Sequence, residues 1–148
     1  MRVRDLVETI PEIDPAKVAI AGQSRMGKNA IETGVHDARF ALVCANCGGT
    51  KSLKLLPNLC YPHWFSAKIK PYVSRNKLSQ PLDTLMAEAA KFPDPPFDQS
   101  AFVACIAPRA LVISSATEDR TSPPAASRML FNEANHVFRL SASRSAGT

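Results

Sequence analysis

The sequence has few aromatic residues, no long apolar run and no block of like charge. Aromatic residues make up 7% of the 148 residues, and lysines and arginines are scattered although the net charge is +5. No apolar stretch approaches the roughly 20 residues that a membrane-spanning helix needs, and no basic cluster is interleaved with aromatic side chains. We therefore expect neither a membrane partner nor a nucleic-acid partner. Residues 1–10 carry acidic side chains and do not resemble a signal peptide, so the localisation stays open.

Hydrophobic residues, at 45% of the chain, are sufficient to build the core of one domain. Apolar runs of strand length occur at 17–22, 40–46 and 110–115, and a helix-compatible segment at 25–34 separates the first two. This order predicts a βαβ unit and hence an α/β fold with a mostly parallel sheet that has helices on both faces.

Other elements are predicted from local patterns. Helices are expected at 3–10, 82–91, 97–106 and 122–134, with Gly34 as the C-cap of the helix that starts at 25. A fourth strand is expected at 136–140. Prolines at 57, 62, 71, 81 and 93 break residues 48–96, which we interpret as a loop-rich lid or substrate-binding insertion. The domain is thus expected to span 1–140, followed by a disordered tail at 141–148.

The strand at 17–22 runs directly into Gly22-Gln-Ser-Arg-Met-Gly27 and then into a helix. A strand, a tight turn and a helix together raise the hydroxyl of Ser24 above the edge of a parallel sheet. The backbone N–H of Arg25 then lies at a helix N-terminus, where negative charge is stabilised. Glu118 and Asp119 follow the strand at 110–115, so they are expected at the same sheet edge.

Two alternatives remain for the serine turn. Gly22-x4-Gly27-Lys28 also fits a phosphate-binding loop, but Asn29 stands where Ser or Thr should hold magnesium. The turn can also be an ordinary connection in which Ser24 caps the helix.

The four cysteines also allow several interpretations. Cys44-x2-Cys47 followed by Cys60-x2-His63 has the spacing of a zinc ribbon. However, Cys44 lies inside an apolar run, where a thiol packs readily. Buried or idle thiols are therefore favoured over zinc, with a disulfide as the third possibility.

Five motifs in one order carry a resemblance to a known family. They are Gly22-Gln-Ser-Arg-Met-Gly-Lys-Asn-Ala30, Tyr61-Pro-His-Trp-Phe65, Pro96-Phe-Asp-Gln99, Ala104-Cys-Ile-Ala-Pro-Arg109 and Ser115-Ala-Thr-Glu-Asp119. Together they resemble the glucuronoyl esterases, which are carbohydrate esterases of the α/β-hydrolase superfamily and are secreted or periplasmic. The resemblance implies a partial α/β-hydrolase fold.

The resemblance also implies roles for individual residues. Ser24 would be the nucleophile, and Arg25 would support the oxyanion through its backbone N–H and its side chain. Asp119 would be the acid of the triad, with Glu118 as the second candidate. No metal and no organic cofactor is implied.

Two further positions match residues that hold the uronate sugar in the family. Lys28 would bind it by hydrogen bonding, and Trp64 would stack on it. The implied partner is a carbohydrate ester of the glucuronoxylan type, a 4-O-methyl-glucuronoyl ester of cell-wall xylan or lignin.

The chain departs from the family pattern at the positions where family members usually carry the catalytic acid and the catalytic base. Residues 50–60 contain no Glu or Asp, and Ser100 stands where the family commonly has His. After the third expected strand the sequence contains one histidine, His136. We expect His136 to pack in the fourth strand rather than act as the base. We therefore expect a domain truncated at both ends, without the first strands and the catalytic histidine, that is inactive alone.

Three other functions stay open on the sequence. An acetyl-xylan esterase or another carboxylesterase would use the same serine. A non-catalytic remnant or a small zinc-binding module would not use this serine for catalysis.

Overall fold

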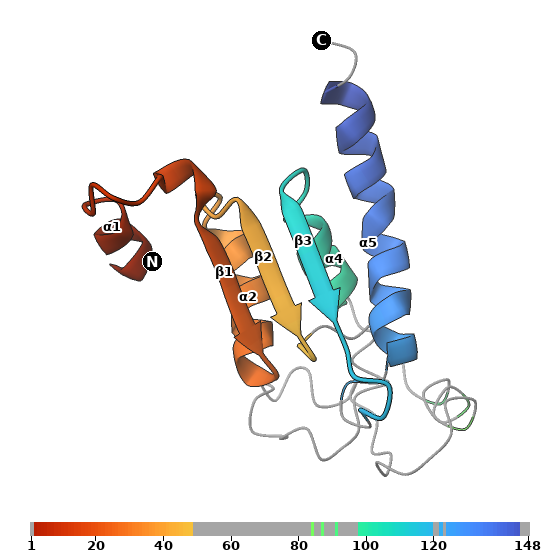
Figure 1. The fold of residues 1–148 in the computed structure, drawn as a ribbon. Helices are drawn as coiled ribbons and strands as arrows, with labels where there is room; N and C mark the ends of the chain where they lie inside the picture. Colours follow the sequence, from red (N-terminus) through yellow and green to blue (C-terminus); the bar gives the residue numbers. More distant parts are fainter. Residues whose placement is uncertain are drawn as a thin grey trace.

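A computed structural model describes residues 2–48, 98–119, 122 and 124–145, together with residues 84, 87 and 91. Figure 1 shows the arrangement of its elements. In chain order they are α1 (Arg2–Val7), the 3-10 helix η1 (Pro15–Lys17), β1 (Ala19–Gln23), α2 (Arg25–His36), β2 (Leu42–Asn46), α4 (Gln99–Ala104), β3 (Ala110–Ser114) and α5 (Pro124–Ser145).

The three strands form one parallel sheet in the order β1-β2-β3, which confirms the predicted strands and their parallel arrangement. The register begins with Ala19, Leu42 and Ala110 side by side, and it ends with Gln23, Asn46 and Ser114. Because all three strands point the same way, their last residues meet at one edge (Figure 1). We call this the carboxyl edge of the sheet.

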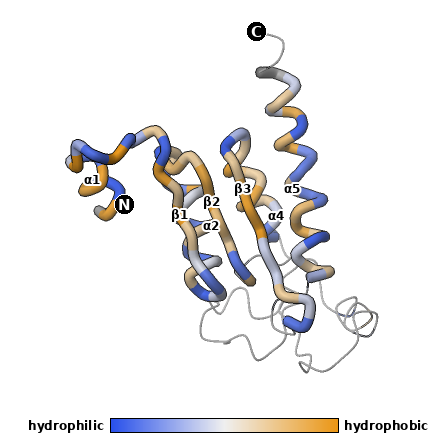
Figure 2. Tube along the Cα trace, in the orientation of Figure 1, coloured by the Kyte–Doolittle hydropathy of each residue, from blue (hydrophilic) through white to orange (hydrophobic). Residues whose placement is uncertain are grey.

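One face of the sheet forms the core. Val43 and Ala45 of β2 are buried there, with Ile20, Leu111 and Ile113 packed around them. Side chains from three helices complete the cluster: Ala30 and Ile31 of α2, Val103 of α4, and Leu130 and Ala134 of α5, together with Ile106 just after α4. The strands are hydrophobic along most of their length and become hydrophilic towards the carboxyl edge (Figure 2).

The opposite face of the sheet is open in the part of the chain that the structure describes. Ala19, Ala21, Ala110 and Val112 are exposed on it, and Val112 retains 49% of its accessible surface. The helices that were expected on both faces thus cover one face within the described ranges (Figure 1). None of these helices combines the length and the apolar composition that crossing a membrane requires.

The prediction that Gly34 is the C-cap of α2 is wrong. The helix continues to His36, with Asp37 as its C-cap, and Gly34 lies buried against β2. A β-carbon at Gly34 would overlap Cγ2 of Val43. The glycine is therefore needed for close packing of α2 on β2 rather than for a turn.

The predicted strand at 136–140 is wrong, because α5 continues through Ser145. Leu130, Ala134 and Phe138 follow at intervals of four residues and pack on the core, which is helical spacing. The strand prediction rests on the apolar residues at 137, 138 and 140. The helix also includes residues 141–145, where a disordered tail was expected to begin.

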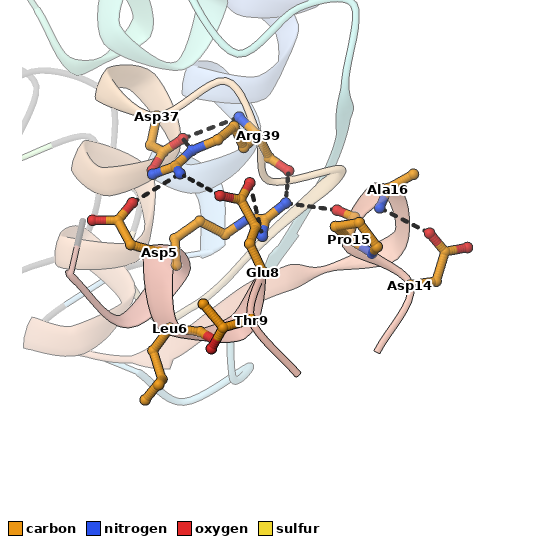
Figure 3. Close-up of polar contacts among 10 residues, drawn as sticks. Asp5, Leu6, Glu8, Thr9, Asp14, Pro15, Ala16, Asp37 and Arg39 are labelled. Atoms are coloured by element: carbon orange, nitrogen blue, oxygen red, sulfur yellow. Dashed lines mark hydrogen bonds and ion pairs between the residues drawn. The ribbon is translucent and has the colours of Figure 1, made fainter. Parts of the chain in front are cut away.

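Charged side chains join α1 to the chain after α2, at the sheet edge opposite the carboxyl edge (Figure 3). Arg39 Nη2 donates to Asp37 Oδ2 at 2.6 Å, and Arg39 Nη1 forms ion pairs with Asp5 at 2.8 Å and Glu8 at 3.0 Å. Asp37 is buried, and its hydrogen bond with Arg39 lowers its pKa to about 2. The same contacts raise the pKa of Arg39.

Arg4 is the second cation of this edge, and it is 2% exposed. Its Nη2 donates to the carbonyl oxygen of Pro15 at 2.6 Å, and its guanidinium carbon lies 5.9 Å from the ring centre of Phe40. An ion pair of 3.3 Å links it to Glu8. These contacts fix α1 against the start of the sheet.

Candidate functional site

Ser24 is the first residue after β1 and lies at the carboxyl edge. Its backbone has φ 53° and ψ −116°, a conformation that L-residues rarely adopt. Its N–H donates to the carbonyl oxygen of Asn46 at 2.8 Å, and its side chain is exposed. The side chain makes no capping bond to α2, so the alternative of a capping serine has no support. The strained turn presents the hydroxyl to solvent.

Close contacts between backbones make this turn possible. A β-carbon at Gly22 would overlap the carbonyl oxygen of Met26, and one at Gly27 would lie 2.9 Å from the carbonyl oxygen of Asn46. A β-carbon at Gly48 would lie 2.5 Å from the carbonyl carbon of Gly27. The strand, the helix and the chain after β2 therefore touch one another through glycines beside Ser24.

The first residues of α2 contribute the groups predicted to bind negative charge and sugar. The helix begins at Arg25, whose backbone N–H is at the N-terminus, and the side chain of Arg25 is exposed. Lys28 is half-buried, and its N–H donates to the carbonyl oxygen of Ser24 at 3.1 Å. The N-terminal position suits the stabilisation of an oxyanion.

The chain after β2 connects β1 with β3 and α4. Cys47 has φ 49°, and its N–H donates to the carbonyl oxygen of Ser114 at 2.7 Å. Ser114 Oγ donates to Asn46 Oδ1 at 3.1 Å, and Gln99 Nε2 donates to the carbonyl oxygen of Gly48 at 3.4 Å. Three consecutive residues, Asn46 to Gly48, thus fix the middle of the carboxyl edge.

Asp119 and Glu118 follow β3 and differ in their surroundings. The N–H of Asp119 donates to the carbonyl oxygen of Ala116 at 3.1 Å, and Asp119 Oδ1 accepts the N–H of Ser122 at 3.0 Å. Asp119 is half-buried, whereas Glu118 is exposed. The carboxylate that is fixed by the backbone is the better acid, because its direction is set before substrate arrives.

The structure brings Ser24 and the acidic pair to the same sheet edge. Ser24 follows β1 and Asp119 follows β3, with β2 between them. Neighbouring strands lie roughly 4.8 Å apart, so the two outer strands are about 10 Å apart.

The histidines that the structure describes lie away from this edge. His36 ends α2, which runs back from the carboxyl edge to the start of β2. His136 is exposed in α5, 12 residues after Pro124, or about 18 Å along a helix. The described residues therefore do not contain the catalytic base.

Several predicted site residues fall outside the described ranges. Trp64, Cys60 and His63 are among them. Cys44, Cys47 and Cys105 carry free thiols, and the described residues contain no group of three or more side chains able to hold a metal. The zinc alternative also needs Cys60 and His63, so the described residues do not test it.

Comparisons with known proteins match most of the chain. A family model described as "Glucuronyl esterase, fungi" matches residues 1–141. A carbohydrate esterase of an unknown prokaryotic organism is 33% identical over 146 residues, which cover 92% of this chain and 30% of that protein.

Solved structures match as well. A promiscuous esterase of carbohydrate esterase family 15 from a marine bacterial metagenome superimposes with a TM-score of 0.70 at 33% identity, over 93% of this chain and 33% of that one. A glucuronoyl esterase from Solibacter usitatus gives a TM-score of 0.71 at 30% identity, over 94% of this chain and 34% of that one. The chain therefore spans about a third of the length of these relatives.

The neighbours are α/β-hydrolases, so the parallel sheet with its helices is part of an α/β-hydrolase fold. The family model covers nearly the whole chain. From these findings it follows that the chain belongs to the glucuronoyl esterase family.

Proposed function

We propose that this chain supplies the nucleophile and the acid of a serine carboxylesterase that acts on 4-O-methyl-glucuronoyl esters of plant cell-wall xylan and lignin. The observation that carries the proposal is the strained, exposed Ser24 at the edge that also bears Asp119. Family membership supports the class of reaction.

In this reaction Ser24 Oγ attacks the ester carbonyl carbon and forms a tetrahedral intermediate. The backbone N–H of Arg25, at the N-terminus of α2, stabilises the negative oxygen. Loss of the alcohol leaves an acyl-serine, and water then attacks it and releases the uronate. Asp119 orients the histidine that carries the proton.

The proposed substrate contact within the described residues is Lys28, one turn of α2 beyond Ser24. Its cationic side chain can donate charge-assisted hydrogen bonds to the hydroxyl and ether oxygens of the sugar, whose carboxyl group is neutral while it is esterified. Trp64 is the proposed stacking partner. An acetyl-xylan ester would need neither a cation nor this ring, which is why the uronate is favoured over acetyl-xylan.

A base is needed to deprotonate Ser24, and neither described histidine reaches it. We therefore propose that the 148-residue chain, expressed alone, hydrolyses no methyl glucuronate. Removing members of a serine triad costs roughly 10⁴–10⁶ in rate. Measurable turnover that is abolished by Ser24→Ala would contradict this proposal.

A chimera tests the reaction itself. In the Solibacter usitatus esterase, the matching third is replaced by this chain, and hydrolysis of benzyl or methyl glucuronate is measured. We expect hydrolysis in the chimera and its loss in Ser24→Ala, while Ser143→Ala, an exposed serine of α5, leaves the rate unchanged. A chimera that is folded by circular dichroism but is equally active with Ser24→Ala would refute the assignment.

The same chimera separates the alternatives. Faster hydrolysis of acetyl-xylan than of the glucuronate would favour an acetyl-xylan or general carboxylesterase. A folded but inactive chimera would favour a non-catalytic remnant. Stoichiometric zinc in the purified 148-residue chain would favour the zinc module.

A further inference from the structure

One peptide group at the end of β2 joins the two outer strands of the sheet. It lies between Asn46 and Cys47, and we call it the 46–47 peptide group. Its carbonyl oxygen accepts the N–H of Ser24 at 2.8 Å, and its N–H donates to the carbonyl oxygen of Ser114 at 2.7 Å. A β-carbon at Gly27 would lie 2.9 Å from the same carbonyl oxygen, which therefore lies against both ends of the serine turn. The orientation of this peptide group thus fixes the N–H of the proposed nucleophile.

The backbone of Cys47 opposes this orientation. Cys47 has φ 49°, a left-handed conformation that residues other than glycine rarely adopt. Reversal of the 46–47 peptide group would return Cys47 to a negative φ, and it would turn the carbonyl oxygen away from Ser24. In the described ranges Ser24 is the other non-glycine residue with positive φ, so the two strained residues meet at one hydrogen bond. Such strain persists only where surrounding contacts hold it.

The side chain of Asn46 supplies contacts that hold the strained residue in place. Its Oδ1 accepts two hydrogen bonds, from Ser114 Oγ at 3.1 Å and from Cys47 Sγ at 3.3 Å. The backbones of Ser114 and Cys47 are the ones joined by the 2.7 Å hydrogen bond. Because Oδ1 binds both of their side chains, it keeps these two backbones in contact. A peptide group whose N–H is hydrogen-bonded is also a better acceptor at its carbonyl oxygen.

We infer that Asn46 is a positioning residue for the nucleophile: its side chain keeps Cys47 bonded to β3, so that its carbonyl oxygen holds the N–H of Ser24. The catalytic meaning of this arrangement rests on the proposed function, whereas the link between Asn46 and the Ser24 N–H is a property of the folded chain. Asn46 is exposed, so removal of its side chain leaves no cavity in the core. Its variants should therefore fold.

Hydrogen exchange of the Ser24 N–H in the 148-residue chain, measured by NMR, tests the link without any turnover. Asn46→Ala should accelerate this exchange roughly two- to tenfold, as the weakening of one hydrogen bond implies. Asn46→Asp retains an oxygen for both donors and should keep the exchange close to that of the wild type. The N–H of Asp37 donates to the carbonyl oxygen of Thr33 at 2.8 Å, at the far end of α2. It should exchange alike in all proteins, which excludes a general loss of stability.

Two neighbouring serines provide a matched pair of variants. Ser114→Ala removes a donor to Asn46 Oδ1 and should accelerate the exchange of the Ser24 N–H. Ser115 Oγ donates instead to Ser127 Oγ at 2.9 Å, so Ser115→Ala should leave that exchange unchanged. Unchanged Ser24 exchange in folded Asn46→Ala, or equal effects of the two serine variants, would overturn the inference.

Kinetics in the chimera test the catalytic part of the inference. Asn46→Ala should lower kcat on methyl glucuronate about tenfold and leave KM unchanged, because a small displacement of a reacting group lowers the rate steeply. Asn46→Asp should recover most of this loss. A raised KM with unchanged kcat would mean that Asn46 binds the substrate, and it would overturn the positioning role. Failure of the proposed function looks different, since the chimera would then be inactive, or insensitive to Ser24→Ala, with Asn46 intact.

Discussion

The two edges of the sheet use their polar residues differently. At the edge where the strands begin, charges face one another: Arg39 contacts three carboxylates, including buried Asp37. At the carboxyl edge, Ser24 and Cys47 occupy strained backbone. The Ser24 side chain is exposed there, and glycine backbones touch beside it. The first edge is built for stability, and the second stores strain where a reaction is proposed.

The largest effect is expected from filling the glycine contact beside Ser24. Gly22→Ala should lower the free energy of unfolding by about 3 kcal/mol, the upper end of the usual overpacking range, because the new methyl group meets the Met26 carbonyl oxygen. Gly34→Ala is the matched control, since its methyl group meets only the Val43 side chain. In urea unfolding experiments, adding Val43→Ala should recover the free energy of unfolding that Gly34→Ala loses, but not the free energy that Gly22→Ala loses. Equal relief of both would mean that the contact at Gly22 can relax.

The second effect belongs to the edge where the strands begin. Asp37→Asn should lower the free energy of unfolding by about 1–2 kcal/mol, because it weakens charged hydrogen bonds to a partly solvated Arg39. The Arg39 side chain is 37% exposed, so the loss stays below that of a fully buried pair. Asp14→Asn, at an exposed pair with Lys17, should cost much less. A similar cost for both would remove the distinction between the network and an ordinary surface pair.

The third prediction is a gain in the free energy of unfolding rather than a loss. Ser24→Gly should raise the free energy of unfolding by about 1 kcal/mol, because glycine relieves the strain at φ 53° and no capping bond is lost. Ser24→Ala keeps a β-carbon and should bring no such gain. Thermal unfolding of the three proteins measures the difference. A stability of Ser24→Gly below that of Ser24→Ala would show that the turn is unstrained.

The smallest effect is on the dependence of stability on pH. The pKa of Asp37 is lowered from 3.8 to about 2 in the folded chain. Its contribution is therefore fully present above pH 3.8 and is lost as the pH falls through about 2. Urea unfolding between pH 4 and pH 2 should show a steeper loss in the wild type than in Asp37→Asn. Identical slopes would mean that Asp37 titrates normally.

Much of the sheet was predictable because its signals are local. The apolar runs gave all three strands within two residues, and the glycines around Ser24 marked the turn. The end of α5 was not predictable in this way. Val137, Phe138 and Leu140 fit a short strand as well as a helix, and the packing of Phe138 on the core decided the outcome.

The site was only partly predictable for a different reason. Ser24, Arg25 and Asp119 are marked by motifs, whereas the sequence allows Cys47 as a zinc ligand, an idle thiol or a disulfide partner and does not predict its left-handed backbone. Cysteine has no known preference for positive φ, so the sequence carries no signal for its conformation. The Arg39–Asp37 contacts were likewise missed, because two charges in a short connection look like ordinary surface residues.

The unbroken register of the three strands limits how this chain can change in length. Gln23, Asn46 and Ser114 lie side by side without a bulge, and the residues that follow them carry the proposed chemistry. One inserted or deleted residue inside a strand would turn the core side chains to the open face. It would also carry the serine or the acid away from its neighbours. Natural insertions and deletions in related chains should therefore collect in the connections, with strand lengths held constant from one homologue to the next.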